Sequence, residues 1–405
     1  MVNMKGKKLL AGVSALALCA SLATPTFASN SPNGNLSNSN QVYSVNGFTD
    51  YAQMVDRLHQ IANNSQGRVA LEVVGQSNQG RDIYQARVGT GGKVIFIESE
   101  IHGNEKTGTE AILNILQYLG SSNSPEAKKI REEVTLVALP KMNPDASELD
   151  RRGNDMSWAE VQAQFPQLAG IGPTWNYYTS SNMQQRDYSE RPGFDVNRDF
   201  NPDLNYVPKA GDVPGSSSQP GWYITPESQT VRDVYKALQA EFGKVDVFID
   251  LHHQGQYYVE GTDDLVTMSL SADFVPDPTT AEGAKYAKYA DNFNLEYSKQ
   301  LNLAAYNALQ SLGNSSPFNN ITLYSQNLDL PGTALGSFAL NGSGTILFEV
   351  RGQSHSLGQK KKGQLVKAVE TGLYGIINGV TDGSVEQLDP KEYDQIPRTS
   401  YQPGI

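Results

Sequence analysis

Four residues with side chains that can bind or serve a metal ion stand at three separate places in the sequence. They are His102 and Glu105 in I-H-G-N-E, His252 in F-I-D-L-H-H, and Glu349 in T-I-L-F-E-V-R. Two imidazoles and one carboxylate leave zinc a fourth position for water, so that the ion can generate a nucleophile. Glu349 follows an apolar run typical of the end of a buried strand, where loss of water raises the basicity of a carboxylate. The sequence therefore predicts a hydrolytic zinc site with one ion per chain and Glu349 as its general base.

The spacing of the histidines supports two ligands and leaves the third open. His102 and Glu105 are three residues apart, so one turn can direct both side chains at one ion. His252 and His253 are adjacent, and neighbouring residues of a strand point to opposite faces. Only one of these two can therefore join the first pair. His59, in an amphipathic stretch, and His355, in a polar stretch, are expected at the surface.

Eight short motifs accompany these residues. In chain order they are Y-A-Q-M-V-D-R-L-H-Q-I-A, V-V-G-Q-S-N-Q-G-R-D-I, H-G-N-E, N-P-D, D-V-N-R-D-F, T-P-E-S, D-L-H and F-E-V-R-G. Their order and spacing resemble the zinc metallocarboxypeptidases of the carboxypeptidase A/B family, the funnelins, and specifically a secreted bacterial member. The resemblance extends over nearly the whole chain after its first forty residues.

This resemblance assigns the open positions around the metal. It implies that His252 is the third ligand and that His253 leaves the site. It also implies that Asp195, at the start of D-V-N-R, accepts a hydrogen bond from the first histidine ligand, which fixes the tautomer of that ring. The alternative for Asp195 is a turn residue whose side chain bonds to its own backbone.

The resemblance likewise implies which residues bind substrate. Asn197 and Arg198 match the pair that holds the free C-terminal carboxylate, and a planar guanidinium suits a carboxylate because the two meet in a bidentate fork. Arg152 matches the arginine that polarises the scissile carbonyl group, and Arg151 is then expected to be a solvated neighbour. Tyr324 is the candidate for the tyrosine that covers the substrate, although it stands about three residues from the position that a gapless count gives.

A gapless count from Glu349 places Ala334 at the family's specificity position. The residues around it in P-G-T-A-L are small or apolar. None of them would pair with a lysine or arginine side chain, which favours the release of neutral or apolar C-terminal residues. A charge from one of the inserted segments remains the alternative.

Alternating strand and helix patterns surround the motifs. The strand pattern K-V-I-F-I-E-S leads directly to His102, the strand pattern V-D-V-F-I-D-L leads to His252, and a helical pattern follows Glu105. Open α/β sheets bind ligands at such strand ends. We therefore predict an α/β fold, namely a single domain with a mixed, mostly parallel central sheet flanked by helices. Further helices are expected at residues 51–62, 282–312 and 359–377, and inserted loops at residues 155–191 and 210–221.

The first residues read as a secretory signal peptide. Three lysines precede an apolar stretch, and the small residues of Thr26-Phe27-Ala28 follow it. Cleavage near Ala28 and secretion are expected. Lipidation of Cys19 is the alternative, which the bulky Leu18 before it disfavours.

The expected organisation follows from these boundaries. We predict a signal peptide at residues 1–28, a polar linker at 29–41, a catalytic domain at 42–380 and a C-terminal tail at 381–405.

Composition limits the partners. The formal net charge is −11, and removal of a signal peptide that carries three lysines and no acidic residue makes it −14. Such an acidic chain is a poor match for nucleic acid. No apolar run reaches the roughly 20 residues of a membrane span, so no membrane contact is expected after signal removal. The lone cysteine excludes an internal disulfide. We expect a monomer that acts on peptides or proteins with a free C-terminus.

Three functions are consistent with this sequence. The favoured hypothesis is a secreted zinc carboxypeptidase that hydrolyses C-terminal peptide bonds. A cell-wall peptidase of the same fold, acting on peptidoglycan stem peptides, is the alternative. A catalytically silent peptide-binding homologue is disfavoured because the ligand positions and the position of the base are all filled.

Overall fold

A computed structural model describes residues 47–184, 186–313, 318–352 and 358–404. The predicted signal peptide, the polar linker, Cys19 and His355 lie outside these residues. Within them, no helix is both long and apolar enough to cross a membrane.

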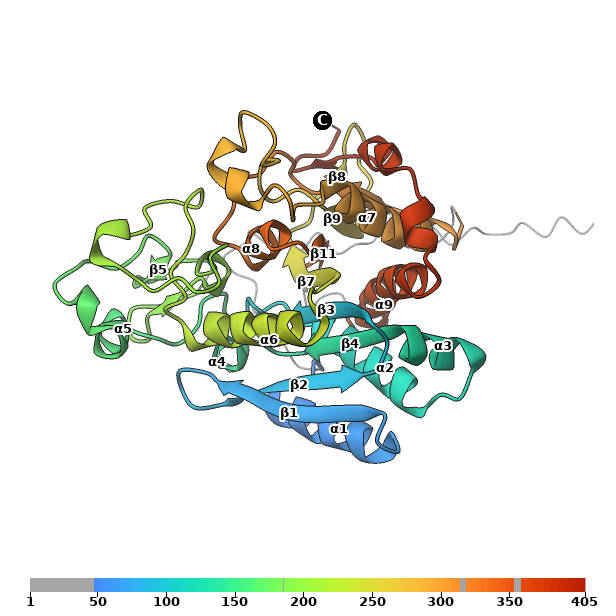
Figure 1. Ribbon diagram of the computed structural model, residues 1–405, viewed down its shortest axis with the longest axis horizontal. Helices are drawn as coiled ribbons and strands as arrows, with labels where there is room; N and C mark the ends of the chain where they lie inside the picture. Colours follow the sequence, from blue (N-terminus) through green and yellow to red (C-terminus); the bar gives the residue numbers. More distant parts are fainter. Residues whose placement is uncertain (1–46, 185, 314–317, 353–357, 405) are drawn as a thin grey trace, which may run out of the picture.

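An eight-stranded sheet forms the centre of the molecule, with strand order β1-β2-β4-β3-β7-β11-β9-β10 (Figure 1). Its central neighbours β4, β3, β7 and β11 are parallel to one another, whereas β1 with β2, β2 with β4 and β11 with β9 are antiparallel. The predicted mixed α/β sheet is confirmed. The strands of this sheet are β1 (Val69–Gln76), β2 (Asp82–Val88), β3 (Lys93–Ser99), β4 (Val134–Leu139), β7 (Val247–Gln254), β9 (Met268–Ser271), β10 (Ile321–Leu323) and β11 (Gly344–Arg351). Two small sheets pair β5 (Tyr177–Tyr178) with β6 (Gly193–Phe194), and β8 (Tyr258–Val259) with β12 (Thr399–Ser400).

Helices cover both faces of the sheet. They are α1 (Tyr51–Asn64), α2 (Thr107–Ser121), α3 (Pro125–Glu133), α4 (Pro144–Glu148), α5 (Trp158–Gln164), α6 (Pro226–Phe242), α7 (Leu295–Gln310), α8 (Ala334–Leu340) and α9 (Gly358–Asp382). Short 3-10 helices lie at Pro166–Leu168, Val196–Arg198, Ala210–Asp212, Ala284–Tyr289, Ser384–Gln387 and Pro390–Gln395. Local sequence explains the helix starts. Asp50 caps α1 with a reciprocal bond to Gln53, and Thr225 and Pro226 begin α6.

Two apolar layers hold these helices against the sheet. One layer joins α1, α2, α7 and α9 to residues such as Ile249 and Leu251 of β7. The other joins α6 and α8 to Phe248 of the same strand. Successive side chains of a strand point to opposite faces, and burial on both faces explains why these strands are nearly continuous apolar runs. His252, which follows Leu251, therefore lies on the face of α6 and α8.

The parallel strands bring distant residues together at their carboxyl ends. In the pairing of β11 with β7, Glu349 lies directly beside His252. β3 lies on the other side of β7 and leads to His102. The sheet thus gathers at one edge residues that are far apart in the sequence.

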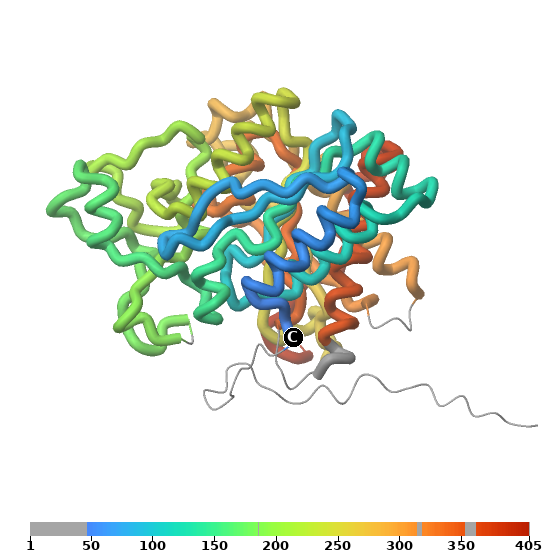
Figure 2. The backbone as a smooth tube through the Cα atoms, turned by 90° about the horizontal axis from the view of Figure 1, so that it is seen from below, coloured from blue at the N-terminus to red at the C-terminus, as the bar shows by residue number. Residues whose placement is uncertain are grey.

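Much of the predicted inserted region, with α5 and β5, lies at one end of the molecule, on the left in Figures 1 and 2. Met156, Val161 and Leu168 of this region share an apolar cluster with Phe194, Trp222 and Ile224, which lie outside the predicted insertions. The insertions are therefore packed structure rather than open loops.

The predicted tail is also packed. Its boundary at residue 381 falls inside α9, which ends at Asp382. After it, Val385, Tyr393 and Ile396 are buried, and β12 pairs with β8. A few apolar residues spaced through this stretch fix it to the rest of the fold. Because the stretch is polar on average, its composition did not predict this packing.

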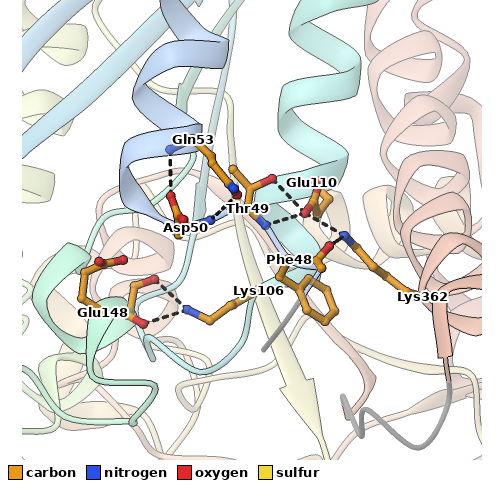
Figure 3. A pocket seen from close by; sticks show the side chains of 10 residues that line it. Phe48, Thr49, Asp50, Gln53, Lys106, Glu110, Glu148 and Lys362 are labelled. Carbon is orange, nitrogen blue, oxygen red and sulfur yellow. Dashed lines mark hydrogen bonds and ion pairs between the residues drawn. The ribbon is translucent and has the colours of Figure 1, made fainter. Parts of the chain in front are cut away.

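A cavity of about 720 Å³ lies where residues 47–50 enter the fold, between α1, α2 and α9 (Figure 3). Glu110 of α2 accepts hydrogen bonds from the backbone N–H and the hydroxyl of Thr49, both at 2.9 Å. It also forms an ion pair with Lys362 at 3.0 Å. On the other wall, the Lys106 ammonium donates to the backbone and side-chain oxygens of Ser147, both at 2.8 Å. Lys106, Glu110 and Lys362 all have partners within the chain. Their contacts attach the first described residues to the rest of the fold.

Candidate metal centre

His102, Glu105 and His252 are buried and offer three ligand atoms that all lie within 4.8 Å of one another. His102 Nδ1 is 3.0 Å from one carboxylate oxygen of Glu105, and His252 Nδ1 is 2.9 Å from the other. The two Nδ1 atoms are 3.1 Å apart.

This donor set fits zinc. Ligands at about 2.0–2.1 Å from a tetrahedral ion are separated from one another by roughly 3.3 Å, close to the distances found here. Two imidazole nitrogens that face each other at 3.1 Å repel through their lone pairs unless a cation or a proton lies between them. Two histidines and one carboxylate also leave a fourth position free, as in catalytic zinc sites.

Carboxylates orient both histidines from behind. His102 Nε2 lies 3.3 Å from Asp195 Oδ1, and His252 Nε2 lies 2.7 Å from Asp250 Oδ2. A ring that donates its Nε2 hydrogen to a carboxylate turns the Nδ1 lone pair toward the metal and becomes a stronger ligand. Asp195 occupies the position that the resemblance implied. Asp250 was not predicted, although D-L-H places it two residues before His252 and therefore on the same face of β7.

Arginines keep Asp195 ionised. Burial acts to raise its pKa, but the charges of Arg152 and Arg198 outweigh burial and hold that pKa well below the usual range. A charged Asp195 is the form that accepts the His102 hydrogen.

His253 points to the opposite face of β7 and helps to begin α2. Its Nε2 accepts a hydrogen bond of 3.0 Å from the backbone of Thr107, the first residue of that helix. Its own backbone N–H donates to Glu105 at 3.2 Å. Burial lowers the pKa of His253 to about 4, so the ring is neutral and can accept. The structure places His252, and not His253, with the other two ligands.

A buried ion pair supports the turn that carries His102. Glu100 has a positive φ of 57° and is fully buried, a backbone conformation that a residue other than glycine adopts only at a cost. Both of its carboxylate oxygens accept from the buried Lys141 ammonium, at 2.8 and 2.7 Å. Sequence reasoning missed this pair. The only signal was an acidic residue inside an apolar strand end, in E-S-E-I-H.

We expect Lys141→Met to lower the free energy of unfolding by about 3 kcal/mol, because it removes the nearer of the two ammonium groups that pair with the buried Glu100 carboxylate and leaves only Lys106 at 3.7 Å. Urea denaturation followed by circular dichroism measures the change. Lys367→Met is the matched control, since Lys367 is 59% exposed in its pair with Glu370 and such surface pairs contribute about 0–1 kcal/mol. Equal losses in the two variants would contradict the anchoring role of Lys141.

Glu349 has a carboxylate oxygen without a partner among the described residues. This oxygen, Oε2, is buried. Burial raises the pKa of Glu349 to about 8; the charge of Glu105 adds to this rise, while His252 and Arg152 oppose it. A basic carboxylate therefore lies beside the candidate ligands without being one of them.

The Arg152 guanidinium lies over the same site. Its Nε donates to Asp195 Oδ2 at 2.9 Å, and its Nη1 is 3.3 Å from His102 Nδ1. Burial opposes the charge, but Asp195 outweighs burial and raises the pKa of Arg152, so the guanidinium remains charged. A fixed cation at this place can stabilise negative charge that develops on a substrate oxygen.

The prediction that Arg151 is a solvated neighbour is wrong. Arg151 is buried, donates to the backbone oxygens of Gly153 and Arg191 at 3.1 and 2.5 Å, and lies over the ring of Tyr188. It satisfies carbonyl groups of the surrounding loops and so holds the loop that carries Arg152.

The two predicted carboxylate-binding residues lie next to the metal ligands. Asn197 Nδ2 is 3.2 Å from His252 Nε2, and Asn197 Oδ1 accepts from the backbone of Ala334 at 3.0 Å. Arg198 Nη1 donates to the backbone oxygen of Asn197 at 2.6 Å, while its Nε is buried and has no partner among the residues that the structure describes. The free donor of Arg198 and the predicted specificity residue Ala334 thus share the neighbourhood of Asn197.

Tyr324 follows β10 directly, and its backbone N–H donates to Leu270 at 2.8 Å. Burial raises the pKa of Tyr324 above its usual range, the charge of Glu349 raises it further, and the charge of Arg152 lowers it. That Tyr324 is the tyrosine that covers the substrate stays a prediction.

Comparisons of sequence and of structure both match this chain to carboxypeptidases. A sequence model of the zinc carboxypeptidase family matches residues 54–338, a range that contains the three candidate ligands and ends before Glu349. A zinc carboxypeptidase of Saccharothrix mutabilis subsp. capreolus is 27% identical over 140 residues, which are 32% of this chain and 32% of that protein. The aligned part is thus about a third of the length of that curated relative.

Two crystal structures share the fold. A metallo-carboxypeptidase from Burkholderia cenocepacia aligns with a TM-score of 0.51 and 15% identity, over 82% of this chain and 69% of that one. Carboxypeptidase A from Helicoverpa armigera aligns with a TM-score of 0.50 and 14% identity, over 82% of this chain and 74% of that one.

Proposed function

The chain belongs to the zinc carboxypeptidase family, and from this membership we propose that it is a zinc-dependent metallocarboxypeptidase of the A/B type that removes residues from the C-termini of peptides. One observation carries the proposal. One set of zinc ligands lies beside the unpaired Oε2 of Glu349 and the charged Arg152, and Asn197 connects it to the Nε donor of Arg198. A base, an oxyanion partner and a carboxylate partner are the groups that this hydrolysis needs.

His102, Glu105 and His252 would hold the zinc ion, which would supply Lewis-acid chemistry to water and to the scissile carbonyl group. The residues of the chain supply the rest. Glu349 takes a proton from the attacking water and returns it to the leaving amine. Arg152 donates to the carbonyl oxygen as negative charge develops on it.

Arg198 determines that cleavage occurs at the end of the peptide. Its free Nε–H donates to the terminal carboxylate, and a charge-assisted bond of this kind is stronger than a neutral one. Ala334 and its small neighbours offer no charge to the departing side chain, which supports a preference for neutral or apolar C-terminal residues.

We further propose that the protein is secreted as a monomer after cleavage near Ala28 and that peptides or proteins with free C-termini are its substrates. Secretion rests on the basic, apolar and small-residue order of residues 1–28.

Blocking the substrate's C-terminus tests the proposal. We expect a peptide amide to be cleaved with a kcat/KM about a hundredfold or more below that of the free acid, because the charge-assisted contact to Arg198 is lost and a buried donor is left unpaired. Arg198→Ala is expected to lower activity on the free acid and to remove most of this difference. Release of the terminal residue is measured by mass spectrometry.

Arg232→Ala is the control, since Arg232 pairs with the neighbouring exposed Asp233 on α6. It should keep the full difference between acid and amide. Equal cleavage of blocked and free peptides by the unaltered protein would refute the role of Arg198 and indicate an endopeptidase.

A further inference from the structure

Tyr401, in the segment expected to be a tail, exposes 57% of its surface to solvent. An exposed aromatic ring is unremarkable when it stands on a free chain end. This ring is instead held in place from several sides, which makes it a preformed surface.

Three sets of contacts fix the ring. The backbone just before it pairs with β8, and just after it the N–H of Gly404 donates to Thr262 at 2.9 Å. The phenol oxygen lies 2.8 Å from the hydroxyl of Ser325. The ring meets Tyr257 edge to face, with 4.7 Å between ring centres and 80° between planes. A ring that is already immobile loses little entropy when it binds a ligand.

These contacts connect Tyr401 to the candidate metal centre. Tyr257 stands five residues after His252, and the hydroxyl of Thr399, two residues before Tyr401, lies 2.8 Å from that of Ser269, the cross-strand neighbour of Glu349. Ser325, the partner of the Tyr401 phenol, directly follows Tyr324. Tyr401 therefore joins the two loops that flank the base.

The ring lies away from the proposed site of the terminal carboxylate. Arg198 donates to the backbone of Asn197, which lies against His252 of β7. Tyr401 instead follows β12, whose Thr399 hydroxyl lies 2.8 Å from that of Ser269 in β9, and β11, which carries Glu349, lies between β7 and β9 in the sheet. An extended peptide advances about 3.3 Å per residue. A peptide with its carboxylate at Arg198 and its scissile bond beside Glu349 then reaches Tyr401 with residues that precede the scissile bond.

We propose that Tyr401, supported by Tyr257, forms a subsite for an aromatic or large apolar side chain on the N-terminal side of the scissile bond. The proposal rests on the proposed carboxypeptidase function. Aromatic rings favour edge-to-face or offset contact with another ring, and the exposed surface of Tyr401 provides such a partner.

Acetylated five-residue peptides test this subsite. All end in leucine. In each test peptide, phenylalanine replaces one of the three alanines that directly precede the bond to this leucine. We expect the unaltered protein to cleave at least one phenylalanine peptide with a kcat/KM about three- to tenfold above that of the all-alanine peptide, mainly through KM. Tyr401→Ala should abolish this preference, and Tyr401→Phe, which keeps the ring, should retain most of it.

Trp175→Ala is the control, because Trp175 is also exposed, at 40%, but belongs to the insertions; it should leave the preference intact. Thermal melting of each variant shows whether β12 stays in place. Binding of the same peptides to the Glu349→Gln protein, followed by calorimetry, gives a readout that does not depend on turnover.

The results separate the two proposals. If the unaltered protein releases leucine from none of the peptides, the proposed function fails, and the binding measurement alone decides the subsite. If leucine is released but phenylalanine brings no gain at any position, or the gain survives in a folded Tyr401→Ala protein, the subsite is refuted.

Discussion

Glu349→Gln is expected to lower kcat by about 10²- to 10⁴-fold, the usual contribution of a positioned general base. Glutamine has nearly the same shape but cannot take a proton from water. Zinc should remain bound, because Glu349 is not among the three clustered ligands. The loss should also appear in kcat/KM, since the proton transfer occurs only in the transition state.

The measurement combines zinc content by atomic absorption with steady-state release of a C-terminal leucine. Glu260→Gln is the control, because Glu260 is exposed and lies beyond β8. Turnover of Glu349→Gln close to that of the unaltered protein, with zinc present, would remove Glu349 from the reaction.

The pH dependence follows from the same carboxylate. Only ionised Glu349 can accept a proton, so activity falls as the pH drops through its pKa. Burial places that pKa at about 8 in the chain without metal, and the positive charge of bound zinc lowers it. We therefore expect the acidic limb of the kcat/KM profile to lie below pH 8 and to disappear with Glu349→Gln.

The sequence was sufficient for the residues that open α/β sheets place at strand ends. His102 follows the apolar strand β3, and His252 and Glu349 lie in the last residues of β7 and β11, so the fold that the pattern predicts also brings them together. Here the local pattern and the long-range arrangement obey the same rule.

Residues whose roles depend on contacts between distant segments could not be identified in this way. Lys141 is 41 positions from Glu100, and no local pattern distinguishes a buried lysine from a solvated one. Arg151 and Arg152 are adjacent, yet one holds loop carbonyls and the other faces the ligands. Their difference arises from the loops that surround them.

The segment after residue 380 shows the same limit. It is polar on average, and among its described residues three apolar side chains are buried, namely Val385, Tyr393 and Ile396. Tyr401 lies beyond them, and it is held in place because β12 pairs with β8. Each of these strands has two residues, which is too short for a periodic pattern to reveal.

The second large effect concerns the third ligand. His252→Ala is expected to weaken zinc binding by about a thousandfold, because structural zinc sites of four ligands contribute roughly 10–16 kcal/mol in total and one ligand is removed. Asp250→Asn should weaken it by about 10- to 100-fold, since it removes the carboxylate that orients the His252 ring. His253→Ala should have the smallest effect, because that ring faces α2 and touches the site only through the backbone bond to Glu105.

Competition with a chromophoric chelator measures all three affinities under one condition, and circular dichroism confirms that each variant is folded. The order of the three variants is more informative than any single value. Loss of His253 removes a bond to the start of α2 and would lower stability in any case, so a fall in melting temperature alone says nothing about ligation. A His253→Ala protein that is folded and binds zinc more weakly than His252→Ala would transfer the third ligand to residue 253. Equal affinities for Asp250→Asn and the unaltered protein would instead show that the 2.7 Å bond between Asp250 and His252 does not strengthen the ligand, and that the ring is oriented by the packing of β7 alone.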